Sequence, residues 1–385
     1  MFQAVPALFT HVTAIRGKAM NSPLLTPYRS TALHLPNRTA MAPMTRARAD
    51  DTTGVPTPIM TEYYTQRAAA GLIVSEGIWP HPLGKGGPGV PGLTESAHVE
   101  GWRRLTRAVH AAGGRIFAQL WHVGRVSHPD LLGGEQPVAP SAVAISHGQI
   151  FTAAGPKDYV APHELSAAET AETVRSHATA ARNAIDAGFD GVEINGAYGY
   201  LIAQFLSDNA NLRTDGYSDR VRFAIEVVEA VAATIGADRT GLRISPGNPL
   251  LDIVESDPAP RYHRLLDALD GMGLAYLHVV QSGKYAALED LRPRWNGTVV
   301  ATCDGPEPGG RGQAERTLRA GLADVYAFGR LFLANPDLPQ RIASDAPLNP
   351  MRTTGMYGGG AEGYVDYPRL SDGAGRGRTG VSPAR

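Results

Sequence analysis

The stretch Gly191-Val192-Glu193-Ile194-Asn195-Gly196-Ala197-Tyr198-Gly199-Tyr200 decides the fold of this chain. Its first half predicts a short buried strand, because the β-branched residues Val192 and Ile194 stand between turn-forming residues. Helical patterns precede it over 166–187 and follow it over 201–206. A strand between two helices is typical of a parallel sheet, in which polar functional residues gather at the carboxyl ends of the strands.

Apolar segments and helical patterns alternate along the rest of the chain. The expected strands cover 38–44, 72–77, 115–120, 191–195, 241–245, 275–280, 299–302 and 324–328. Eight strands that alternate with helices over this length predict an α/β fold of one domain, the (β/α)8 TIM barrel. A long loop, 124–162, follows the third strand, and we interpret it as an excursion from the barrel that covers the substrate.

The two ends of the chain differ from the barrel in composition. Residues 1–19 contain apolar residues interrupted by proline, histidine and arginine, and they lack the pattern of a signal peptide. We therefore expect an N-terminal extension there, with the barrel over 20–370. Residues 371–385 are rich in glycine, arginine and serine, which predicts a disordered tail.

Charge and composition narrow the classes of partner. The 385 residues carry a formal net charge of −1, so no basic face for nucleic acid is expected. No apolar run reaches about 18 residues, so no membrane span is expected. The single cysteine, Cys303, excludes an internal disulfide and fits a reducing compartment. We expect a cytoplasmic protein that is a monomer or a homodimer.

Polar side chains and glycines follow the ends of the expected strands, and a barrel brings these ends to one rim. They are Thr45, Gly77, Gln119, Trp121, Asn195, Tyr198, Tyr200, Arg243, Gly329 and Arg330. Each has a structural alternative when it is taken alone. Arg243 suits an ion pair inside the barrel, Thr45 suits a turn, and the tyrosines suit packing on a neighbouring helix. The whole set suits an aromatic, anionic cofactor.

Longer motifs connect these positions to a known family. The segment 192–206, followed by Asn211-Leu212-Arg213-Thr214-Asp215, resembles the Old Yellow Enzyme family of FMN-dependent ene-reductases. Further motifs at 42–46, 75–77, 117–125 and 357–368 are similar to those of the family and stand in the family's order. The resemblance implies non-covalently bound FMN, NAD(P)H as co-substrate, and reduction of the activated C=C bond of a small α,β-unsaturated carbonyl or nitro compound.

The resemblance also implies roles for individual residues. Tyr200 matches the proton donor, and Tyr364 matches a residue of the substrate pocket, where we also expect Trp121. Arg243 would stabilise the negative charge of a reduced flavin, and Gln119 offers both a donor and an acceptor to its pyrimidine edge. The expected flavin contacts are Pro43, Met44, Thr45, Gly77, Gln119, Arg243, Gly305, Gly329 and Arg330, with the phosphate near the last three.

The chain departs from the family at the substrate anchor. A histidine paired with an asparagine or a second histidine usually holds the substrate oxygen, at the positions of Asn195 and Tyr198 here. An amide and a phenol can donate hydrogen bonds, but neither carries the positive charge that histidine can carry. We therefore expect weaker polarisation of the substrate or a shifted substrate pose.

Three alternatives remain open from the residues. The altered anchor also suits a specialised biosynthetic flavoenzyme, such as a desaturase, an isomerase or a nitro-reductase. A flavin-free barrel lyase is the second alternative, with Lys284 as the one well-placed lysine. The third is a protein that holds FMN without turnover, which the retained Tyr200 disfavours. Consumption of NADPH in each turnover separates the main prediction from a redox-neutral isomerase.

Overall fold

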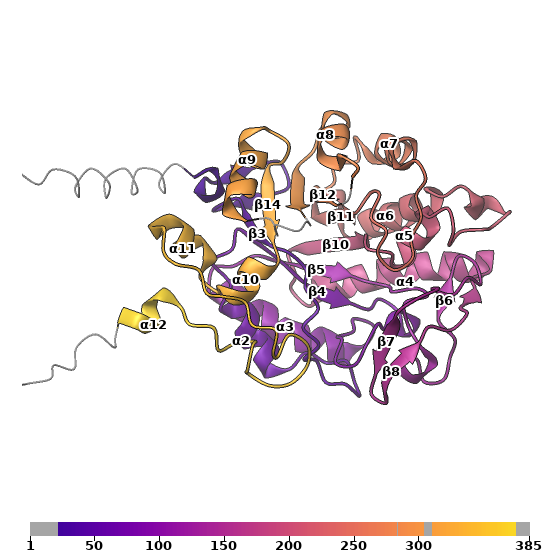
Figure 1. Cartoon of the computed structure of the whole chain (residues 1–385), viewed down its shortest axis with the longest axis horizontal. Coiled ribbons are helices and arrows are strands. Elements are labelled where there is room, and N and C mark those ends of the chain that lie inside the picture. The colour runs from indigo at the N-terminus through magenta and orange to yellow at the C-terminus, as the bar shows by residue number, and fades with distance from the viewer. Residues whose placement is uncertain (1–21, 283, 304–309, 375–385) are drawn as a thin grey trace, which may run out of the picture.

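The computed structural model of the chain describes residues 22–282, 284–303 and 310–374. Eight parallel strands close into one barrel and follow one another around it in chain order (Figure 1). They are β3 (Thr39–Met41), β4 (Leu72–Ile78), β5 (Ile116–Leu120), β10 (Gly191–Gly196), β11 (Thr240–Ile244), β12 (Tyr276–Gln281), β13 (Val299–Cys303) and β14 (Val325–Phe328). The prediction of a (β/α)8 barrel is confirmed.

Helices follow the strands and surround the barrel (Figure 1). They are α2 (Pro58–Thr65), α3 (Ser96–Ala111), α4 (Ala167–Asp186), α5 (Leu201–Leu206), α6 (Arg222–Ile235), α7 (Pro258–Leu269), α8 (Ala287–Leu291), α9 (Arg311–Arg319), α10 (Arg330–Ala334), α11 (Leu338–Ser344) and α12 (Leu370–Ala374). A capping box of Ser166 and Glu169 begins α4. Helix α2 starts at Pro58, because proline suits the first turn of a helix.

The long excursion expected over 124–162 follows β5 and contains regular structure of its own. Strand β6 (Val138–Ala139) pairs in parallel with β9 (His163–Glu164), and β7 (Gln149–Thr152) forms an antiparallel hairpin with β8 (Gly155–Asp158). Ile145 and Ile150 of this excursion belong to the same buried apolar cluster as Trp121, against which Tyr200 packs. The excursion therefore covers the rim of the barrel beside β5 and β10.

Short elements complete the described chain. They are the strands β1 (Tyr28–Arg29) and β2 (His34–Leu35), and the 3-10 turns η1 (Pro23–Leu25), η2 (Pro82–Gly84), η3 (Pro129–Leu131), η4 (Gly216–Ser218), η5 (Ala237–Arg239) and η6 (Arg292–Arg294). The expected extension 1–19 lies outside the described residues. Helix α12 occupies the first positions of the expected tail 371–385, and the rest of that tail lies outside the described residues.

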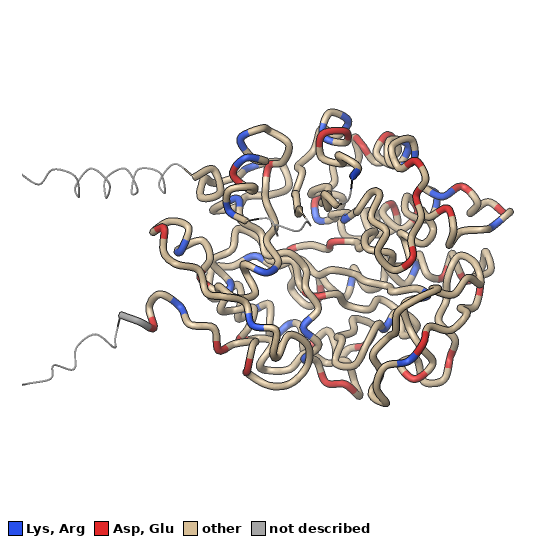
Figure 2. The backbone as a smooth tube through the Cα atoms, in the orientation of Figure 1, with Lys and Arg blue, Asp and Glu red and all other residues tan. Residues whose placement is uncertain are grey.

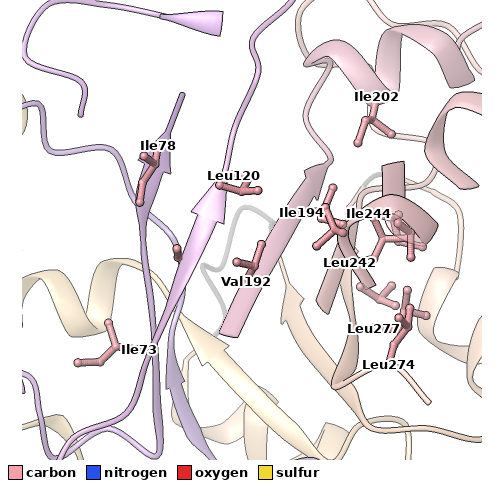
Figure 3. Close-up of a cluster of buried hydrophobic side chains, with 14 of the residues drawn as sticks. Ile73, Ile78, Leu120, Val192, Ile194, Ile202, Leu242, Ile244, Leu274 and Leu277 are labelled. Atoms are coloured by element: carbon pink, nitrogen blue, oxygen red, sulfur yellow. The ribbon is translucent and has the colours of Figure 1, made fainter. Parts of the chain in front are cut away.

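Alternation along β10 explains both the core and the polar interior of the barrel. Val192 and Ile194 join the apolar core cluster, where Ile202 of α5 packs with them (Figure 3). Glu193 and Asn195 point the other way and bond to Gln119 of β5, which is buried inside the barrel. Successive side chains of a strand face opposite sides of the sheet. Val192 and Ile194 therefore face the surrounding helices, while Glu193 and Asn195 lie inside the barrel beneath its rim.

Charged residues of both signs are interspersed along the backbone (Figure 2). This agrees with the net charge of −1. Among the described helices, none combines the length and the apolar character that crossing a membrane requires.

Candidate active site

A cavity of about 500 Å³ opens at the rim formed by the carboxyl ends of the strands. Of the residues expected at the site from the sequence, seven line it, namely Pro43, Met44, Tyr198, Tyr200, Arg243, Gly329 and Arg330. The sequence analysis missed further lining residues, which are Ala42, Leu250, Thr302, Cys303, Tyr326, Ala327, Phe328, Leu331 and Tyr357. Thr302 lies near the carboxyl end of β13, and this position was the available signal for it.

Arg243 of β11 brings a buried positive charge to this cavity. Its side chain is 4% exposed, and its Nε has no hydrogen-bond partner within the described residues. Its Nη2 lies 3.5 Å from the hydroxyl of Tyr198, and its Cζ lies 4.9 Å from the centroid of the Tyr198 ring. A buried guanidinium with a free donor fits an anionic group in the cavity, such as the N1–O2 edge of a reduced flavin.

A network of buried polar side chains forms the floor beneath the cavity. Gln119 donates from Nε2 to Oε1 of Glu193 over 2.7 Å, and Nδ2 of Asn195 donates to Oε1 of Gln119 over 3.3 Å. The other carboxylate oxygen of Glu193 lies 2.8 Å from Nδ1 of His278 and accepts a bond from Tyr276. Although burial raises the pKa of Glu193, His278 and then Arg243 hold it below its ordinary value. The network therefore keeps a carboxylate and fixes the Gln119 amide.

Tyr200 is the partly buried phenol that precedes α5. Its ring meets the indole of Trp121 edge-on, with 4.9 Å between ring centroids. Its hydroxyl makes no hydrogen bond within the described residues. Burial, together with the neighbouring Tyr159 and Tyr357, raises the pKa of Tyr200 above its ordinary value. Tyr200 therefore keeps its proton at neutral pH and presents it to the cavity.

The two residues at the expected anchor positions point in different directions. The amide of Asn195 is 5% exposed, accepts a bond from the Ala197 N–H at 2.9 Å, and does not line the cavity. Tyr198 lines the cavity and has a left-handed backbone, with φ of 54°, while its N–H donates to Oγ of Ser245. This turn directs the Tyr198 ring toward Arg243, so the two residues do not act as a side-by-side pair of donors.

Tyr364, which we expected in the substrate pocket, does not line the cavity. Its side chain is fully buried and stacks on Tyr63 of α2, with ring centroids 4.1 Å apart. Tyr357 lines the cavity instead, and 68% of it is exposed. The glycines that follow Tyr357 were the signal that a turn there could bring a side chain to the rim.

The other expected residues that the structure describes do not line the cavity. Gly77 lies so close to the indole of Trp121 that any side chain at this position would collide with the ring. Thr45 is partly buried directly after Met44. Gly305 lies outside the described residues. Lys284, the lysine of the lyase alternative, is exposed and does not line the cavity.

A (β/α)8 barrel with a partly unbonded guanidinium, four phenols and a Gly-Arg pair around one rim cavity is an enzyme scaffold suited to an anionic aromatic cofactor. Residues 23–349 match the model of the NADH:flavin oxidoreductase / NADH oxidase family. This chain therefore belongs to that family, and the resemblance to the Old Yellow Enzymes is confirmed. It is an FMN-dependent oxidoreductase that uses NAD(P)H.

Relatives and solved structures support this assignment over nearly the whole chain. The chain is 39% identical to 12-oxophytodienoate reductase 1 of Oryza sativa subsp. japonica over 380 residues, 94% of this chain and 97% of that protein. It is 38% identical to flavin oxidoreductase hxnT of Emericella nidulans, over 90% of this chain and 97% of that protein. The structure of the old yellow enzyme homologue from Zymomonas mobilis is similar with a TM-score of 0.86, at 39% identity, over 90% of this chain and 99% of that chain. The structure of morphinone reductase in complex with tetrahydroNAD is also similar, with a TM-score of 0.86. It is 40% identical over 92% of this chain and 99% of that chain.

Proposed function

We propose that this flavoenzyme reduces the activated C=C bond of an α,β-unsaturated carbonyl or nitro compound and that Tyr200 donates the proton. The observation that carries the proposal is the Tyr200 hydroxyl, which is protonated and has no hydrogen-bond partner in the described chain, on the wall of a cavity that also contains Arg243. A phenol that is protonated at neutral pH and lies on the cavity wall can donate its proton to the α-carbon of a bound alkene. When bound, FMN supplies the hydride chemistry.

The lining residues provide a site for the cofactor. Arg243 stabilises negative charge at one edge of the ring system, and Gln119 retains one N–H and one lone pair for that edge from below. Pro43 and Met44 form the adjoining wall, with Thr45 next to them. We place the phosphate beside the backbone of Gly329 and the Arg330 side chain, and Gly305 remains a further candidate for it.

Substrate binding is proposed to differ from that of a paired-histidine site. Tyr198 presents its hydroxyl to the cavity and is the proposed donor to the substrate oxygen. The amide of Asn195 donates to the Gln119 amide. In this arrangement Asn195 therefore positions Gln119 and does not contact the substrate. The buried indole N–H of Trp121 has no partner within the described residues and is a further donor beside Tyr200.

The first test is the visible spectrum of the purified protein, followed by anaerobic addition of NADPH or NADH. Flavin absorption that bleaches on addition of the nucleotide, and returns with 2-cyclohexenone or a nitroalkene, is the expected result. We also expect one NADPH to be consumed for each alkene that is reduced. A reduced flavin that neither class of alkene reoxidises would overturn the proposed substrate class while leaving the cofactor assignment intact.

A specialised reaction at the same site is the second candidate, as a desaturase, an isomerase or a nitro-reductase. The different directions of Asn195 and Tyr198 favour such a reaction, because the two side chains cannot both donate a hydrogen bond to one substrate oxygen. Turnover of a substrate without net NADPH consumption would identify the isomerase. Nitro reduction with an intact C=C bond would identify the nitro-reductase.

For the cellular setting, we propose a cytoplasmic enzyme that is a monomer or a homodimer and acts on a small molecule. The single cysteine and the balanced charge support this proposal, since they fit a reducing compartment and provide no basic face for nucleic acid. Size-exclusion chromatography with light scattering tests the oligomeric state.

A further inference from the structure

A glycine-rich loop over 355–363, here called the roof, carries Tyr357 to the cavity. Gly355 and Gly363 stand at its two ends with φ of 70° and 67°. A Cβ on Gly355 would collide with the carbonyl of Glu362, and a Cβ on Gly363 would collide with the carbonyl of Thr354. The two ends of the roof therefore touch, and only glycine allows this approach.

Two buried arginines hold the touching ends. Arg48 donates to the carbonyls of Gly355 and Gly360 over 2.7 and 3.1 Å, and Arg46 donates to the carbonyls of Met356 and Gly363 over 2.9 and 2.7 Å. Arg46 is fully buried and Arg48 is 4% exposed. Charge-assisted bonds of this kind, made away from water, are among the stronger ones in proteins.

The guanidinium groups of both arginines also lie over an aromatic ring. The guanidinium carbon of Arg48 lies 4.1 Å from the centroid of the Tyr364 ring, and that of Arg46 lies 5.0 Å from it. Tyr364 in turn stacks on Tyr63. This explains the buried position of Tyr364, which supports the two arginines rather than the substrate.

The same arginines belong to the segment that lines the cofactor side of the cavity. Arg46 follows Met44 by two residues, and its backbone N–H donates to Oε2 of Glu76 over 3.3 Å. On the roof, the neighbours of Tyr357 on both sides bond to Arg46, through the Met356 carbonyl and through the Gly358 N–H, which donates to the Arg46 carbonyl at 2.9 Å. Arg46 is thus bonded to the residues on both sides of Tyr357.

We infer that Arg46 and Arg48 are positioning residues, which hold the roof so that Tyr357 closes the cavity beside Tyr200. This inference rests on the proposed function for its kinetic readout. Arg46 also connects the roof to Pro43 and Met44, which line the cavity on the side proposed for FMN. A movement of one of these segments would therefore move the other. Tyr357 itself is exposed, and the roof alone sets its place.

The test compares holoenzyme of Arg48→Lys and Arg46→Lys with the wild type. Hydrogen–deuterium exchange of the 355–363 backbone is expected to quicken by about tenfold in both variants, because lysine cannot span several carbonyls. The control is Arg175→Lys, at an exposed arginine paired with Glu172, and it should leave this exchange unchanged. Unchanged exchange in the Arg46 and Arg48 variants would overturn the inference, whatever substrate the enzyme reduces.

A double-mutant cycle tests whether the arginines act through Tyr357. Arg48→Lys and Tyr357→Ala are each expected to raise KM for 2-cyclohexenone by about tenfold, with a smaller change in kcat. The KM of the double variant should not exceed that of Tyr357→Ala alone. A KM raised by the product of the two single effects would contradict the inference.

Gly359→Ala provides a variant that leaves both arginines intact. Gly359 has φ of 75° with open space around its Cβ, so alanine adds backbone strain without a collision. It should quicken exchange over 355–363 and raise KM in the same way, and the inference fails if neither changes.

Discussion

The indole of Trp121 meets the phenol ring of Tyr200 edge-on, with ring centroids 4.9 Å apart and ring planes at 90°. Two further contacts fix this relationship. The indole covers Gly77 of β4, and the N–H of Leu201 donates to the carbonyl of His122 over 3.0 Å. The proposed proton donor is therefore positioned by the ends of two other strands, β4 and β5.

Replacing Gly77 by alanine is expected to disturb Tyr200 without touching the cavity. The new methyl group would collide with the Trp121 ring, so the indole must move away from Tyr200. We expect the free energy of unfolding to fall by about 1–3 kcal/mol, as for other overpacked sites. Chemical denaturation measures this, and alkene reduction should fall with it. A variant of unchanged stability and activity would show that the strand ends do not hold the phenol.

Tyr200→Phe is expected to separate the two halves of the catalytic cycle. Reduction of the bound flavin by NADPH should stay within about twofold, because that step needs no proton from the phenol. Reoxidation by 2-cyclohexenone should slow by about 100-fold or more, the usual range for loss of a general acid. Anaerobic stopped-flow absorbance measures both half-reactions. Equal slowing of both would mean that Tyr200 shapes the site rather than donating a proton.

Arg243→Met is expected to weaken FMN binding. The variant removes a buried cation whose Nε has no partner in the described chain, and a bond to a charged group contributes about 2 kcal/mol, or roughly thirtyfold in Kd. Titration of the apoprotein with FMN, followed by flavin fluorescence, measures the change. Arg239→Met is the matched control, since Arg239 is exposed at the end of η5, directly before β11. An unaltered FMN affinity in Arg243→Met would return Arg243 to a purely structural role.

Asn195→His tests the altered anchor. Imidazole can donate to the substrate oxygen with a partial or full positive charge, which the amide cannot. We expect kcat/KM for 2-cyclohexenone to rise by about tenfold, equivalent to about 1.4 kcal/mol. Asn195→Gln is the control that keeps an amide. If the histidine variant shows no gain, the missing charge does not explain the departure from the family.

Glu76 is expected to make stability depend on pH. Burial raises its pKa from 4.5 to about 7, although it accepts bonds from the N–H groups of Arg46 and Ala47 and from the hydroxyl of Tyr64. The folded chain therefore holds a proton that the unfolded chain releases between these values. The free energy of unfolding should fall by about 3 kcal/mol as the pH rises from 4.5 to 7, relative to Glu76→Gln.

Denaturant titrations of both proteins across this pH range provide the measurement. Contributions from other titrating groups, such as the buried His122 and His177, are shared by the two proteins and cancel in the difference. Parallel curves for wild type and Glu76→Gln would show that folding leaves the pKa of Glu76 unchanged and would contradict the prediction.

The sequence by itself determined the barrel and the rim. Val192 and Ile194 alternate with polar residues, and Ser166 with Glu169 marks the start of α4, so each strand and helix carries a local signal. Parallel strands that close into a barrel must bring their carboxyl ends together, and Tyr200 and Arg243 follow from that rule.

Only the tertiary structure decided which residues of the irregular segments face the cavity. Tyr357 and Tyr364 lie in one glycine-rich stretch without periodicity, and contacts with Arg46, 310 positions before Met356, place one in the cavity and bury the other. Likewise, Tyr198 turns toward Arg243 through a left-handed backbone that its bond to Ser245 supports. Local patterns cannot encode these choices, because a loop side chain takes its direction from partners that are distant in the sequence.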